Sequence, residues 1–101
     1  MNIKELGIPC VKLITPQIHH DSRGYFLETF NLNKLESCIN FGSFVQDNET
    51  YSEYGVLRGI HFQSPPYAQS KLMRVIQGEV FDVIVDLRSD SPTFGKHLEI
   101  I

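Results

Sequence analysis

The sequence predicts an all-β protein made of antiparallel strands, of the β-sandwich or barrel class. Short segments rich in β-branched and aromatic residues recur at a spacing of roughly 8–12 residues. Glycine- and proline-containing turns separate these segments, and only one segment has the apolar spacing of an amphipathic helix. A chain of 101 residues is long enough for one domain with a modest core. We therefore expect residues 1–101 to form a single, largely helix-free domain.

The N-terminal part of the chain predicts two strands, a turn and one helix. Residues 11–14 (Val-Lys-Leu-Ile) form the first strand, and residues 25–30 (Tyr-Phe-Leu-Glu-Thr-Phe) form the second. Between them, residues 20–24 predict a turn, because Asp, Ser and Gly supply the backbone contacts and positive φ that turns use. Asn31 is placed to cap a short helix over residues 32–39.

The remaining residues predict strands separated by turns. The expected strands cover residues 44–49, 55–63, 71–77 and 80–88, with one more beginning at residue 94. The third and fourth of these flank Gly78-Glu79 and predict a hairpin. About six or seven strands are fewer than the eight of a closed jelly roll, so we expect a sheet that is incomplete at its C-terminus. Such a sheet has strand edges that need covering or pairing.

Charge and cysteine content limit the classes of partner. The net charge is −3, and no Lys/Arg run offers a surface for nucleic acid or anionic lipid. No apolar run approaches the roughly 20 residues of a membrane span, and the N-terminus has no signal-peptide pattern. Cys10 and Cys38 lie in no metal or disulfide motif, which favours free thiols in a reducing compartment. We expect a cytoplasmic protein.

Residues with functional chemistry concentrate between residues 23 and 71. They are Arg23, Glu28, Gln46, Asn48, Arg58, His61, Gln63 and Lys71. Each has an ordinary structural interpretation: Arg58 as a solvated strand residue, His61 as a structural histidine, residues 21–24 as a surface turn. Gly59, beside Arg58, favours a functional interpretation, because a glycine inside a strand often marks a bulge or the close approach of a ligand to the backbone.

The same residues argue against a metal. The spacing from Gly55 to His61 fits the first motif of metal-binding cupins, in which Gly is followed by His-x-His and then Glu. Here Gln63 occupies the second His position, and Gln69 and Lys71 lie where the Glu is expected. An amide is a poor transition-metal ligand, and an ammonium repels the ion. We expect no metal and no other cofactor.

The combination of His61 and Lys71 suits proton abstraction beside a carbonyl. A neutral imidazole accepts a proton near neutral pH, and a cation stabilises the enolate oxygen that develops. Arg23 and Arg58 have the guanidinium groups that clasp a diphosphate. Gln46 and Asn48 alternate along one segment and present amides on one face, as contacts to a base or sugar require.

Six blocks in order along the chain resemble the dTDP-4-dehydrorhamnose 3,5-epimerase family. They are Asp21-x-Arg23-Gly24-x-Phe26-x-Glu28-x-Phe30, Phe44-Val45-Gln46-Asp47-Asn48, Gly55-Val56-Leu57-Arg58-Gly59-Ile60-His61-Phe62-Gln63, Gln69-x-Lys71-Leu72-x-Arg74-Val75, Gly78-x-Val80-x-Asp82-Val83-x-Val85-Asp86-Leu87-Arg88 and Ser91-Pro92-Thr93-Phe94-Gly95. The resemblance runs in register along nearly the whole chain, which makes it more specific than any single motif.

The resemblance implies a metal-free cupin jelly roll, a homodimer that shares strands, and inversion of C3 and C5 of dTDP-4-dehydro-6-deoxyglucose. The product leads to dTDP-L-rhamnose, a sugar of lipopolysaccharide and the cell envelope. By motif, His61 is similar to the base and Lys71 to the group beside the C4 oxygen. The implied substrate contacts are Arg58 for the diphosphate or sugar, Arg23, Phe26 and Glu28 for the nucleotide, and Gln46, Asp47, Asn48 and Gln63 in the same pocket.

One departure from the family leaves alternatives open. The family's general-acid tyrosine lies in a C-terminal half, and Tyr25, Tyr51, Tyr54 and Tyr67 are not in that motif. The chain is therefore expected to be either the N-terminal part of an epimerase or a shortened, non-catalytic cupin that binds a dTDP-sugar. A third hypothesis is a related isomerase or epimerase of another 4-keto-sugar nucleotide.

Overall fold

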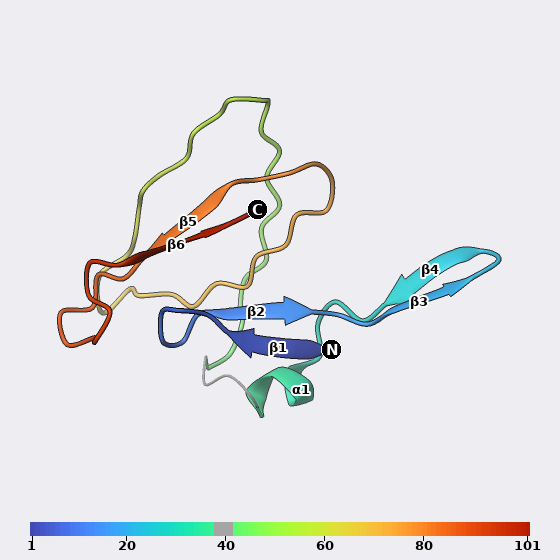
Figure 1. The fold of residues 1–101 in the computed structure, drawn as a ribbon, viewed down its shortest axis with the longest axis horizontal. Helices are drawn as coiled ribbons and strands as arrows, with labels where there is room; N and C mark the ends of the chain where they lie inside the picture. The colour runs from blue at the N-terminus through green and yellow to red at the C-terminus, as the bar shows by residue number, and fades with distance from the viewer. Residues whose placement is uncertain (38–41) are drawn as a thin grey trace. The chain divides into compact units, whose positions relative to one another are not determined.

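The computed structural model describes residues 1–37 and 42–101 and is built from antiparallel hairpins (Figure 1). Three two-stranded sheets pair β1 (Asn2–Glu5) with β2 (Lys12–Thr15), β3 (Ile18–Asp21) with β4 (Gly24–Leu27), and β5 (Asp82–Val85) with β6 (His97–Ile100). Among the described residues the single helix is α1 (Leu32–Glu36). The predicted antiparallel fold with at most one short helix is confirmed.

The hairpin of β1 and β2 pairs apolar residues on one face. Ile3 lies opposite Ile14, and both are half-buried. Glu5 lies opposite Lys12, and the two side chains form an ion pair. The connecting turn buries Ile8, which is 2% exposed. The strand predicted at residues 11–14 is confirmed, but β1 was missed, because its mostly polar sequence becomes a strand only through its partner.

The hairpin of β3 and β4 confirms the turn predicted at residues 20–24. Its two-residue turn, Ser22-Arg23, lies between Asp21 and Gly24, which are paired across the strands. The Asp21 carboxylate accepts a hydrogen bond from the Arg23 backbone N–H at 2.8 Å. Gly24 has φ +131°, where a side chain would be strained. The strand predicted at residues 25–30 is shorter than expected, since β4 ends at Leu27.

Helix α1 begins where the sequence predicts. The Asn31 side chain accepts a hydrogen bond from the Lys34 backbone N–H at 3.2 Å, as an N-cap does. Leu35 is 1% exposed and anchors the helix. The predicted continuation through Cys38 and Ile39 lies outside the described residues.

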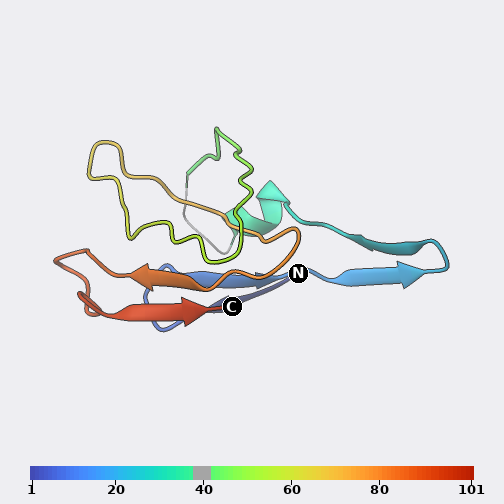
Figure 2. The same ribbon diagram turned by 90° about the horizontal axis from the view of Figure 1, so that it is seen from above.

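Strands β5 and β6 run side by side in both views (Figures 1 and 2) and are joined by a loop built around Asp86. The Asp86 carboxylate is buried and accepts hydrogen bonds from the Arg88 Nε and Nη2 at 2.9 Å each. It also accepts from the Ser91 hydroxyl at 2.5 Å and the Thr93 hydroxyl at 2.7 Å. Arg88 Nη2 donates in addition to the Pro9 carbonyl at 3.0 Å, which ties this loop to the turn before β2.

We expect the Asp86 cluster to make stability acid-sensitive. The Arg88 guanidinium, followed by the Ser91 hydroxyl, holds the pKa of Asp86 well below its usual range. A carboxyl whose pKa is lower in the folded than in the unfolded chain contributes stability above about pH 4, and this contribution is lost as the pH falls. Asp86→Asn should therefore lower the thermal unfolding midpoint at pH 7 by about 5 °C or more.

The control is Asp90→Asn, which removes an exposed carboxylate from the same loop. Its unfolding midpoint should stay close to that of the parent. The gap between Asp86→Asn and the parent should also narrow as the pH is lowered below 4. Equal midpoints for the two variants at pH 7 would show that the cluster contributes no net stability.

The strands predicted over residues 44–49, 55–63 and 71–77 are wrong. Described residues 42–81 contain no helix or strand, and β5 pairs with β6 rather than with residues 71–77. A strand requires a hydrogen-bonded neighbour, and no described segment pairs with these residues. Their apolar side chains are correspondingly open to solvent: Val45 is 91% and Leu57 is 89% exposed.

The chain divides into two compact units. One consists of residues 1–40 and 75–101 and holds the three hairpins and α1, and the other consists of residues 41–74. The expectation of a single domain over residues 1–101 stays a prediction. In the part of the chain that the structure describes, no helix is long and apolar enough to cross a membrane.

Candidate functional site

The unit of residues 41–74 places the predicted base and the predicted cation in one pocket. His61, Gln63 and Lys71 line an open pocket of about 240 Å³, together with Phe62, Ala68 and Gln69. A turn folds the chain so that residues 61–63 and 68–71 share this wall. In that turn the Tyr67 backbone N–H donates to the Ser64 carbonyl at 2.9 Å. Pro65 and Pro66, with fixed φ, favour such a reversal.

The pocket combines one imidazole, one ammonium and two amides. Within the part of the chain that the structure describes, no hydrogen bond or ion pair engages the His61 or Lys71 side chain, so both are available to a ligand. An imidazole accepts a proton, an ammonium stabilises a developing oxyanion, and the amides of Gln63 and Gln69 donate or accept. The arrangement pairs a proton acceptor with a cation, as proton abstraction beside a carbonyl requires.

Four further predicted residues belong to the same unit but do not line this pocket. Arg58 donates from Nε to the Ser52 hydroxyl at 3.0 Å and from Nη2 to the Tyr51 carbonyl at 3.5 Å. Gln46 Nε2 donates to Asn48 Oδ1 at 3.1 Å, as expected for side chains two residues apart on one face. Asp47, between them, is exposed.

The predicted nucleotide contacts Arg23, Phe26 and Glu28 belong to the other unit. Arg23 Nη2 pairs with Asp21 Oδ2 at 2.6 Å, which lowers the pKa of Asp21 and raises that of Arg23. Phe26 is 69% exposed on β4, opposite His19.

Glu28, beyond β4, is held at the start of α1. The Lys34 ammonium lies 2.7 Å from its carboxylate, and Asn31 donates to it at 3.1 Å. The Lys34 contact, more than the Asn31 contact, lowers the pKa of Glu28. Glu28 is therefore charged near neutral pH and fixed in direction.

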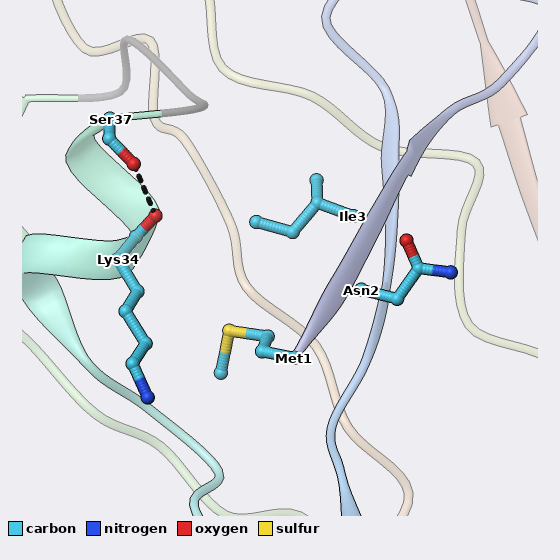
Figure 3. A pocket seen from close by; sticks show the side chains of 5 residues that line it. All are labelled: Met1, Asn2, Ile3, Lys34 and Ser37. Atoms are coloured by element: carbon cyan, nitrogen blue, oxygen red, sulfur yellow. Dashed lines mark hydrogen bonds between the residues drawn. The ribbon is translucent and has the colours of Figure 1, made fainter.

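A larger pocket in the hairpin unit lacks comparable chemistry. It measures about 360 Å³ and lies between the start of β1 and α1, lined by Met1, Asn2, Ile3, Lys34 and Ser37 (Figure 3). The Ser37 hydroxyl donates to the Lys34 carbonyl at 2.9 Å. The Lys34 ammonium is already bound to Glu28, and no imidazole or carboxylate side chain is among the residues that line this pocket.

Sequence reasoning missed part of the pocket wall. Phe62, Ala68 and Gln69 line it, and none was selected as a site residue. The signal that could have found them is the Pro65-Pro66 pair, because a reversal there returns the following residues to the side of His61. The prediction that the site holds no metal rests on Gln63 and Lys71 as the neighbours of His61.

The antiparallel strands are those of a cupin-type fold, and one pocket holds the His61 imidazole and the Lys71 ammonium. It belongs to the dTDP-4-dehydrorhamnose 3,5-epimerase family, whose sequence model matches residues 5–101. The resemblance of the six sequence blocks to this family is thereby confirmed.

Known relatives agree with this membership. The dTDP-4-dehydrorhamnose 3,5-epimerase of Shigella flexneri is 50% identical over 97 residues, covering 95% of this chain and 54% of the relative. That of Escherichia coli K12 is 44% identical over 102 residues and is covered to 55%. The crystal structure of the Bacillus anthracis enzyme with TDP and PPi bound has 46% identity and a TM-score of 0.91, over 98% of this chain and 57% of that chain. The chain spans about half the length of the curated relatives it matches.

Proposed function

We propose that this chain carries the base-bearing part of a dTDP-4-dehydrorhamnose 3,5-epimerase. The reaction inverts C3 and C5 of dTDP-4-dehydro-6-deoxyglucose on the route to dTDP-L-rhamnose, a cell-envelope sugar. The observation that carries the proposal is the shared pocket of His61 and Lys71 in a chain of this family. The decisive measurement is incorporation of solvent deuterium at C3 and C5 of that substrate.

Both carbons flank the C4 ketone, so their hydrogens are acidic for the same reason. His61 removes the proton from C3 or C5, and the electron pair moves into an enolate with its charge on the C4 oxygen. The Lys71 ammonium stabilises that charge. A second group then adds a proton to the opposite face of the same carbon, and the enolate returns to the ketone with inverted configuration at C3 or C5. We assign this group to the part of the family fold that the chain does not match.

The substrate contacts proposed from the family motifs suit a nucleoside diphosphate. Arg23 and Arg58 provide guanidinium groups for phosphate oxygens, and Gln46, Asp47, Asn48 and Gln63 provide polar contacts. Arg23 has a side chain 88% exposed, so its ion pair with Asp21 leaves it open to a ligand. The TDP and PPi in the related Bacillus anthracis structure support this class of ligand.

The second candidate function is a dTDP-sugar-binding module without catalysis. It rests on Arg23 and Arg58, whose guanidinium groups suit a diphosphate whether or not a reaction follows. Binding of TDP with no deuterium incorporation, in this chain joined to the unmatched part of the family fold, would support it. Deuterium incorporation at only one of the two carbons would instead favour the third hypothesis, in the form of a related epimerase that inverts C3 alone or C5 alone.

We expect the protein to associate, with a homodimer as the proposed state and the cytoplasm as the proposed compartment. Large apolar side chains such as Val45, Leu57 and Ile60 are 91%, 89% and 73% exposed, and burying them stabilises an assembly. Sedimentation velocity at micromolar concentration should give twice the chain mass of 11.6 kDa. A folded, stable monomer under the same conditions would contradict the proposed dimer.

A further inference from the structure

Gly59 makes the closest approach to the predicted base of any glycine that the structure describes. A Cβ added to Gly59 would lie 3.1 Å from His61 Nδ1, 3.4 Å from the His61 backbone nitrogen and 3.8 Å from His61 Cε1. The Nδ1–Cε1 edge of the imidazole therefore borders the space that a side chain on Gly59 would occupy. The sequence predicted a bulge or the close approach of a ligand at Gly59, and the structure shows the His61 imidazole beside it.

A side chain at position 59 would contact the His61 imidazole and displace it. A contact of 3.1 Å is tighter than nine in ten real Cβ contacts, so the neighbour must shift by a few tenths of an ångström. The neighbour here is a rigid ring with two side-chain torsions, close to its own backbone, so the shift becomes a rotation of the imidazole. General-base catalysis depends on the position of that ring, because small misplacements of a catalytic group reduce the rate strongly.

We propose that Gly59 is a positioning residue for His61. Its missing side chain leaves room for the Nδ1–Cε1 edge of the imidazole, and the ring can therefore lie in the wall that it shares with Lys71. The proposal rests on the proposed function only in taking His61 as the base. The placement of the ring is tested separately from any reaction.

Gly55 provides a matched control in the same unit. Its φ is +81° and that of Gly59 is +106°, so alanine is strained at both positions. A Cβ on Gly55 would meet nothing within 4 Å, whereas one on Gly59 meets the imidazole. Backbone strain is thus common to the two variants, and contact with His61 is specific to Gly59→Ala.

The first experiment compares Gly59→Ala with Gly55→Ala by NMR of the histidine rings in the 101-residue chain. The ¹³Cε1–¹H and ring ¹⁵N signals of His61, assigned with His61→Gln, should move several-fold further in Gly59→Ala than in Gly55→Ala. The signals of His19, His20 and His97 should not move. Equal His61 shifts in the two variants, or none, would overturn the positioning role.

A double-mutant cycle keeps the proposal testable if Gly59→Ala perturbs folding. In a His61→Ala background the ring is absent, while the positive φ and the contact with the backbone nitrogen at 3.4 Å remain. The loss in denaturation midpoint caused by Gly59→Ala should then be smaller than in the parent. Equal losses in the two backgrounds would refute the contact. A polypeptide that joins this chain to the unmatched part of the family fold and shows no epimerase activity would refute the proposed function but leave both readouts intact.

Discussion

His61→Ala is expected to reduce solvent-deuterium incorporation at C3 and C5 of dTDP-4-dehydro-6-deoxyglucose by roughly 10²–10⁴-fold, the contribution of a general base. The physical reason is that no other group in the pocket accepts a proton: Lys71 is an ammonium, and Gln63 and Gln69 are amides. The measurement uses a polypeptide that joins this chain to the unmatched part of the Shigella flexneri relative, because the chain spans 54% of that relative.

His97→Ala is the matched control. His97 is exposed on β6 and lies 3.3 Å from Glu99, outside the pocket. This variant should retain the parent exchange rate, and His61→Ala should retain TDP affinity, since the proposed nucleotide contacts are untouched. Undiminished exchange in His61→Ala would remove the base assignment, and the binding-module hypothesis would then replace it.

The elements that the sequence predicts well are those whose hydrogen bonds are local. The turn before β4 is set by Asp21, which accepts from the backbone of Arg23 two residues later, and the start of α1 is set by Asn31. Such side-chain contacts can be predicted from a few consecutive residues of the sequence. The observed β1 was missed because its residues carry no strand pattern and depend on β2, which lies seven or more residues away.

The strands predicted between residues 44 and 77 were wrong because these residues have a strand-like sequence but no partner strand among the described residues. Val45, Leu57 and Ile60 have strand propensity, but propensity in sheets mostly measures packing against neighbouring strands. No described segment supplies such a neighbour, and these side chains stay exposed. Periodicity indicated which residues suit a sheet, and it could not indicate whether a partner strand lies beside them.

The sequence predicted which residue types make up the candidate site, but it did not predict the contacts that several of these residues make. His61 and Lys71 were selected because their side chains complement each other in enolate chemistry, and they line one pocket. The engagement of Arg58 with Ser52 and Tyr51 follows from the backbone path between residues 51 and 58, which no local pattern encodes. The same holds for Gly59, whose open space is filled by a ring two residues later.

Lys71→Met is expected to slow the exchange reaction by roughly 10²–10³-fold in the same joined polypeptide, the usual cost of losing one oxyanion-stabilising group. Methionine keeps most of the side-chain length and removes the ammonium. The charge on the C4 oxygen is larger in the enolate-like transition state than in the ketone. The loss should therefore appear in kcat, with a smaller change in KM.

Gln69→Ala separates this charge effect from a general disturbance of the pocket. Gln69 lies in the same wall two residues before Lys71, but it is neutral and is not placed on the C4 oxygen. Its removal should change the exchange rate far less than Lys71→Met does. Equal losses of exchange rate in the two variants would indicate that the shape of the pocket wall, and not the charge of Lys71, determines the rate. A loss in Lys71→Met confined to KM would assign the ammonium to ground-state binding, since an interaction equally strong in substrate and transition state does not raise kcat.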